Sequence, residues 1–122
     1  MTNTDLDNIA LATFMGYNVR IVDDTSTAAR PSYALFSKDG ITTDGVYFDC
    51  SYDALMGVVE KIESLGYDVV ICRSGIQIWK RNVGSSSELI IDEDSYEDYQ
   101  GKRKFDALYK SLVSFARTYK TN

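Results

Sequence analysis

Residues 51–70, SYDALMGVVEKIESLGYDVV, decide the fold because they predict a helix, its end and the start of a strand in one short stretch. Ser51 can accept a free backbone N–H group at the start of the helix. Apolar residues recur at helical spacing over residues 55–65, which predicts one face packed on a core. Gly66 supplies a left-handed end, and the β-branched run that begins at Tyr67 predicts a strand.

The same signals, followed outward, predict two more helices and several strands. A first helix over about residues 5–15 would be capped by Thr4 or Asp5 and end at Gly16, and a last helix would span about residues 102–120. Strands are expected at residues 18–22, 33–37, 46–50, 67–72, 76–80 and 88–91, with 67–72 in the centre of the sheet and with no internal repeat. The order predicts an α+β fold, in which a largely antiparallel sheet of about four or five strands packs with three helices, sandwich-like, in a single domain over residues 1–122.

Composition restricts the possible chemistry. The chain has 122 residues, no histidine, a net charge of −5 and two cysteines. Without histidine, catalysis by a Ser-His-Asp or Cys-His arrangement is excluded, and Cys50 and Cys72 lack the spacing of a zinc site. We therefore expect no enzyme activity, no cofactor and no metal, and we expect both thiols to be buried and reduced.

The chain also lacks the segments that direct a protein to or across a membrane. No apolar run approaches the roughly twenty residues that span a bilayer. The first residues, MTNTDLDN, carry no basic residue and no apolar stretch, so they do not predict a signal peptide. The expected location is the cytoplasm.

Three segments are similar to one family. Residues 9–16, IALATFMG, resemble an I-A-x-F-M-G signature, and residues 107–115, ALYKSLVSF, resemble its closing A-V-Y-x-A-V-V-x-F-I helix. Residues 52–63, YDALMGVVEKIE, are similar to its W-D-x-L-M-P-V-V-E-K-I-E helix, with Tyr52 in place of tryptophan and Gly57 in place of proline. This is the phage ABA sandwich type of small protein from tailed phages and prophages of gut anaerobes. The resemblance implies a sheet layered between helices, an accessory role in the host cytoplasm, and no catalytic residue.

An acidic run with tyrosines precedes the last helix and is the first candidate partner-binding segment. It does not fit a calcium loop, because Glu97 stands where that loop needs glycine. A solvated loop is the simplest interpretation, and the alternative is an acidic strip that mimics nucleic acid on a basic host or phage protein. The candidate binding residues here are Asp92, Asp94, Tyr96, Asp98 and Tyr99.

A basic triplet, Lys102, Arg103 and Lys104, begins the last helix and is the second candidate. Helix, three strands, helix over residues 52–120 is also the element order of a double-stranded RNA-binding domain, which contacts phosphates from its last helix. The acidic balance of the whole chain disfavours nucleic acid as a partner. The function predicted first is therefore binding to a protein partner, the alternative is a nucleic-acid-binding module, and a homodimer through an uncovered sheet edge stays open.

Overall fold

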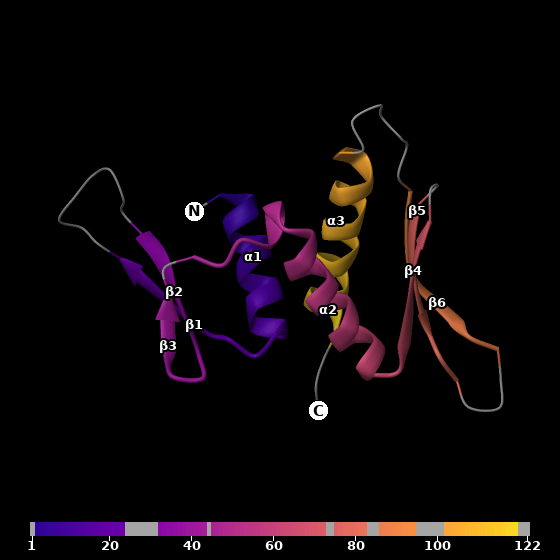
Figure 1. The fold of residues 1–122 in the computed structure, drawn as a ribbon, viewed down its shortest axis with the longest axis horizontal. Helices are drawn as coiled ribbons and strands as arrows, with labels where there is room; N and C mark the ends of the chain where they lie inside the picture. The colour runs from indigo at the N-terminus through magenta and orange to yellow at the C-terminus, as the bar shows by residue number, and fades with distance from the viewer. Residues whose placement is uncertain are drawn as a thin grey trace. The chain divides into compact units, whose positions relative to one another are not determined.

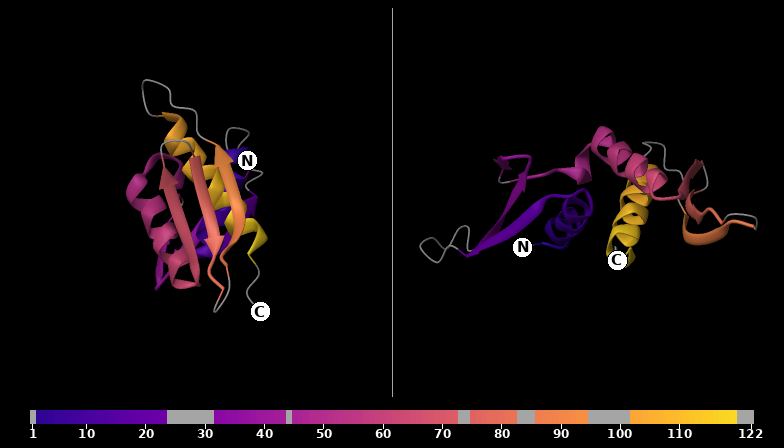
Figure 2. Two further views of the ribbon diagram at one scale, coloured as in Figure 1. Left: turned by 90° about the vertical axis from the view of Figure 1, so that its right-hand side faces the viewer. Right: turned by 90° about the horizontal axis from the view of Figure 1, so that it is seen from below.

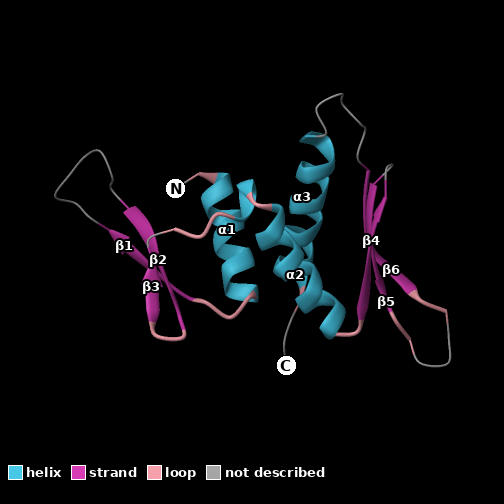
Figure 3. Ribbon diagram, viewed as in Figure 1, coloured by secondary structure: helices cyan, strands magenta, loops and turns pink. Residues whose placement is uncertain are grey.

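The computed structural model describes residues 2–23, 32–43, 45–72, 75–82, 86–94 and 102–119. Its order of helices and antiparallel strands is that of an α+β protein, as the sequence predicts (Figures 1 and 3). The chain divides into two compact units, Met1–Cys50 and Ser51–Asn122. Instead of one sheet of four or five strands, the described residues form two antiparallel sheets of three strands each.

The first unit is a helix followed by a three-stranded meander. The strand order is β1-β2-β3, and β2 and β3 are joined by a tight turn at Asp39 and Gly40, both of which have positive φ values. Its elements are α1 (Asn3–Phe14), β1 (Asn18–Asp23), β2 (Ser32–Lys38), β3 (Ile41–Thr43) and the short 3-10 helix η1 (Phe48–Cys50).

Helix α1 begins earlier than expected because Thr2, not Thr4 or Asp5, is its N-cap. The Thr2 hydroxyl accepts from the backbone N–H of Asp5 at 3.2 Å, and the Asp5 carboxylate accepts from the backbone N–H of Thr2 at 2.8 Å. This reciprocal pair satisfies two free donors at the helix start. The helix ends at Gly16 as predicted, with φ of 94°.

The strand predicted at residues 46–50 is wrong. Phe48 is buried but Asp49 and Cys50 after it are both exposed, so burial does not go on alternating and residues 48–50 form a 3-10 helix. The side chain of Asn8 on α1 donates to the Asp49 carboxylate at 2.9 Å and fixes the 3-10 turn to the helix. Local packing of one aromatic residue therefore replaces strand pairing.

The second unit is a helix, a three-stranded meander and a second helix. Its elements are α2 (Tyr52–Ser64), β4 (Tyr67–Cys72), β5 (Gly75–Lys80), β6 (Glu88–Asp94) and α3 (Lys102–Thr118). The strand order is β4-β5-β6, so β5 is the central strand and β4 lies at an edge, contrary to the prediction. Helix α2 packs against β4, and α3 packs against β5 and β6. Both helices cover the same face of this sheet (Figures 1 and 2).

The core of the second unit lies between the two helices and that face. Tyr67 packs edge-on against Phe115 of α3, with the ring centroids 4.9 Å apart. Each large apolar side chain removed from water here contributes roughly 1.5–3 kcal/mol. The side chains that are at most 1% exposed include Leu55, Val58, Ile62, Ile76, Ile78, Leu108 and Leu112.

The two units repeat one plan, which the sequence analysis did not predict. Each begins with a helix followed by a three-stranded antiparallel meander in sequential order. Each helix ends at a glycine with positive φ, and the chain then reads MGYNV at residues 15–19 and LGYDV at residues 65–69. A basic side chain also caps each helix, from the last residue of β2 or the residue that follows β5: Lys38 Nζ donates to the Met15 carbonyl at 3.0 Å, and Arg81 Nη2 donates to the Glu63 carbonyl at 2.7 Å.

Candidate functional site

The structure places the predicted acidic residues differently from the sequence analysis. Asp92 and Asp94 belong to β6 and not to a solvated loop, because pairing with β5 continues as far as Gly75 opposite Asp94. Backbone pairing at a sheet edge tolerates charged side chains that remain in water, so the strand continues into the acidic run. Tyr96, Asp98 and Tyr99 lie outside the described residues.

The basic triplet lies where it was predicted, at the start of α3. Lys102 and Arg103 are the first two residues of the helix, and Lys104 is half-buried in its first turn. The structure therefore separates the described candidates by element, with Asp92 and Asp94 on a strand and the basic triplet on a helix.

A different surface, which the sequence analysis missed, is the face of the β4-β5-β6 sheet opposite α2 and α3. We call it the open face. Ile76 and Ile78 are fully buried on the helix-covered side, so their neighbours in the alternation lie on the other side. In the second unit no described element covers that side (Figure 2). The open face consists of Asp68, Val70, Cys72, Gln77, Trp79, Leu89 and Asp92.

An apolar stripe crosses the open face. Val70 on β4 is 41% exposed and Leu89 on β6 is 40% exposed. Trp79 on the central strand lies between the two edge strands, directly opposite Leu89, and is half-buried. Its indole N–H donates to the side-chain oxygen of Gln77 at 3.2 Å, which holds the ring in place. Exposed aliphatic residues around an ordered tryptophan are typical of a protein-binding surface.

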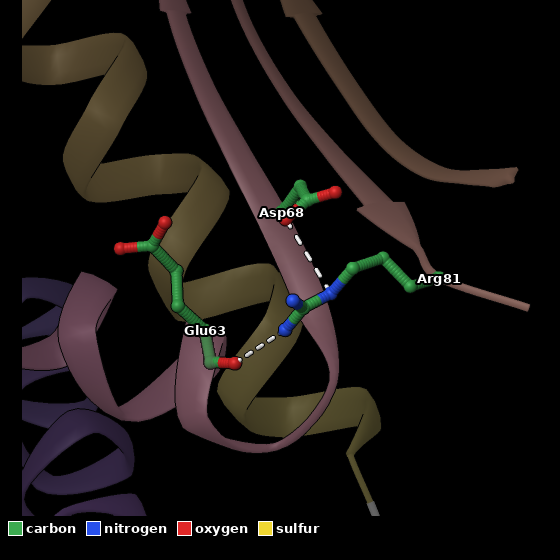
Figure 4. A network of polar contacts seen from close by, with 3 residues as sticks. All are labelled: Glu63, Asp68 and Arg81. Carbon is green, nitrogen blue, oxygen red and sulfur yellow. Dashed lines mark hydrogen bonds and ion pairs between the residues drawn. The ribbon is translucent and has the colours of Figure 1, made fainter.

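Charged groups border the stripe at both ends. At one end the Nε of Arg81 lies 3.4 Å from a carboxylate oxygen of Asp68, and the same guanidinium donates to the Glu63 carbonyl (Figure 4). Arg81 is therefore held by two partners and partly neutralises Asp68. At the other end the exposed carboxylate of Asp92 lies opposite Gln77 and makes no ion pair with any other described residue.

The described residues include no group of three or more histidine, cysteine, aspartate or glutamate side chains placed to hold a metal ion. Both cysteines are free, but Cys50 is exposed and Cys72 is half-buried, so the expectation of two buried thiols is wrong. Among the helices described, none is both long and apolar enough to cross a bilayer.

Comparison with known proteins adds no relative. No family model matches the chain, no curated protein matches it, and no solved structure matches it. The resemblance to phage ABA sandwich proteins therefore stays a prediction. Part of the signal for the open face was present in the sequence, because Trp79 alternates with Ile76 and Ile78 and so belongs to the other side of the strand. Val70 joins it on that side because it pairs with Gln77, which the sequence alone does not show.

Proposed function

We propose that this protein acts by binding another protein through the open face of its β4-β5-β6 sheet. The observation that carries the proposal is the apolar stripe of Val70, Trp79 and Leu89 on a sheet face that no described element of the second unit covers. Burial of such a stripe removes apolar surface from water, and a tryptophan held by a hydrogen bond loses little further freedom on binding.

The biological setting of the proposal comes from the sequence. The similarity of residues 9–16, 52–63 and 107–115 to phage ABA sandwich proteins favours a phage or prophage accessory protein. Such a protein would act in the host cytoplasm on a host or phage protein, without a catalytic step or a cofactor. The free thiols and the absence of histidine are consistent with this role.

The test is co-purification of partners with the tagged full chain and two matched variants. Val70→Glu places a carboxylate in the stripe, and Met56→Glu places the same group on α2 at an equally exposed residue, 41% in both cases. We expect the V70E variant to lose proteins that the M56E variant and the parent chain retain, because a charge buried at an interface core opposes binding. If the V70E and M56E variants retain the same partners equally well, the open face does not bind them.

A second candidate function is binding of duplex RNA, and one observation favours it. The arrangement α2-β4-β5-β6-α3, with both helices on one face and α3 beginning at Lys102, is the element plan of a double-stranded RNA-binding domain. Two features oppose it. Glu60 and Glu63 are exposed on α2, and only two residues separate β4 from β5, which leaves little loop to enter a minor groove.

Duplex RNA at low salt distinguishes the two candidates. If the protein binds duplex RNA, a filter should retain the RNA together with the parent chain. This retention should fall steeply as salt rises, and a Lys102→Glu, Lys104→Glu double variant should abolish it. The protein-binding proposal expects no retention of RNA by the parent chain. The V70E variant serves as the control, because it leaves the basic triplet unchanged.

A further inference from the structure

We propose that the partner contributes an extended basic segment, which adds to the sheet as a strand beside the outer edge of β6. This inference rests on the proposed function and names the chemistry of the partner. The segment would extend the open face, and consecutive lysine or arginine residues would oppose the carboxylates of β6.

The position follows from the sheet order. β6 is the last strand of β4-β5-β6, and no described strand pairs with its outer edge. It spans Glu88–Asp94, and Leu89 and Ile90 are each 40% exposed. An edge strand of this length offers unpaired backbone donors and acceptors to an incoming strand. Leu89 on this strand lies directly opposite Trp79, so the edge adjoins the apolar stripe of the open face.

The register selects the part of β6 that can be paired. The pairing of β5 with β6 shifts between Ile78 and Trp79, so that Ile78 is opposite Ile91 and Trp79 is opposite Leu89. Ile90 is the extra residue of this bulge, and bulges interrupt the pairing of a strand. The regular part of β6 is therefore residues 91–94, IDED, and an added strand would meet mainly acidic residues there.

The alternation of β6 specifies the basic sequence. Asp92 lies on the open face opposite Gln77, whereas Glu93 lies opposite Ile76, whose side chain is buried on the helix-covered side. Successive carboxylates therefore belong to opposite faces of the sheet. A strand complementary to both needs adjacent basic residues, one for each face, and not basic residues at alternate positions.

The same charges argue against a second copy of this chain at the edge. Antiparallel self-pairing of residues 91–94 would bring Asp92 and Glu93 of one molecule beside the same acidic residues of the other. Like charges directly opposite each other on adjacent strands are destabilising. Charge complementarity thus favours a basic strand over a homodimer at β6.

The experiment uses the full chain and a short synthetic peptide of alternating valine and threonine with a central Lys-Arg pair. Trp79 is the only tryptophan and lies on the open face, so its fluorescence reports binding there. We expect saturable binding by this peptide, and none by a peptide with a Glu-Glu centre. N-methylation of the backbone on the edge-facing side should abolish binding, because it removes the strand hydrogen bonds.

A matched pair of charge reversals tests the assignment to β6. Asp92→Lys should raise the Kd of the Lys-Arg peptide about tenfold, since an attraction becomes a repulsion at the interface. Glu60→Lys, the same reversal on the exposed side of α2, should leave it unchanged. The inference is overturned if the peptide does not bind, if N-methylation has no effect, or if the D92K and E60K variants bind equally.

The two proposals can fail separately. If V70E loses natural partners while D92K retains them, the open face binds protein but the basic strand at β6 is wrong. If V70E and D92K both retain those partners, both proposals fail. Sedimentation of the parent chain as a stable dimer that D92K strengthens would identify a second copy as the occupant instead.

Discussion

The guanidinium of Arg81 donates a 2.7 Å hydrogen bond to the backbone carbonyl of Glu63, in the last turn of α2 (Figure 4). The last carbonyls of a helix have no partner within the helix, and they form the negative end of its dipole. The backbone N–H of Arg81 also donates to the Gly66 carbonyl at 3.1 Å. Arg81, the residue that follows β5, therefore fixes both the end of α2 and the start of β4.

Arg81→Ala should lower the free energy of unfolding by about 1 kcal/mol, because it removes a charge-assisted hydrogen bond to a helix end. Asp68→Asn should change it by less than about 0.5 kcal/mol, because that ion pair is half exposed on both sides. Urea denaturation monitored by Trp79 fluorescence measures both. Equal losses in the two variants would mean that the ion pair, and not the cap, is the stabilising contact.

Gly66→Ala should destabilise the protein by about 1 kcal/mol, because the residue has φ of 99° and a Cβ atom is strained there. Beyond Gly66 and its two chain neighbours, no described heavy atom lies within 4 Å of the added Cβ position, so the loss would come from the backbone and not from a clash. Gly66→Asn should lose less, since asparagine tolerates the left-handed region. Thermal unfolding of the two variants side by side checks this order.

Truncating a side chain should lower the free energy of unfolding more on the helix-covered face of the β4-β5-β6 sheet than on the open face. Ile78→Ala should cost about 2–5 kcal/mol because its side chain is fully buried under the helices. Val70→Ala, on the open face and 41% exposed, should cost less than about 1 kcal/mol. Denaturant midpoints provide the comparison, and similar losses would show that the open face is covered in the free protein.

The Thr2–Asp5 capping box should make α1 sensitive to acid. Thr2 holds the pKa of the Asp5 carboxyl below the ordinary value of 3.8. The larger cause is the hydrogen bond from the Thr2 backbone N–H, and the smaller one is the interaction with the Thr2 hydroxyl. A carboxyl with a lowered folded-state pKa stabilises the fold above its unfolded pKa, and this contribution disappears as pH falls through the folded value. NMR titration of Asp5 should give a midpoint under 3.8, and Thr2→Ala should move that midpoint upward.

The sequence predicted the elements whose signals are local. Residues 51–66 carry a complete set, with a capping serine, an apolar stripe and a glycine stop, and α2 spans Tyr52–Ser64 between those residues. Strand β2 and the buried pair Ile76 and Ile78 were predicted for the same reason. Each of these was predicted from a pattern within a short stretch of the chain.

The errors concern choices that local signals do not decide. Sheet order depends on which strands pair, and the residues of one strand do not specify its partners. The apolar residues of β4 predicted a central strand, whereas β4 is an edge strand. Acidic residues oppose a strand on average, yet Asp92–Asp94 joins β6 because its backbone pairs with β5. The candidate site changed accordingly, from a loop to the face and edge of a sheet. The repeat was missed because the two units share glycine-tyrosine helix ends and topology but little other sequence.

The helix-end contacts of the two units also bear on the order in which the chain folds. Lys38 and Met15 are 23 positions apart, and Arg81 and Glu63 are 18 apart, so neither contact closes a long loop. Contacts of short sequence separation form quickly and without the rest of the molecule. Each contact joins residues of one unit, so the helix-end closure of residues 1–50 uses no residue of 51–122.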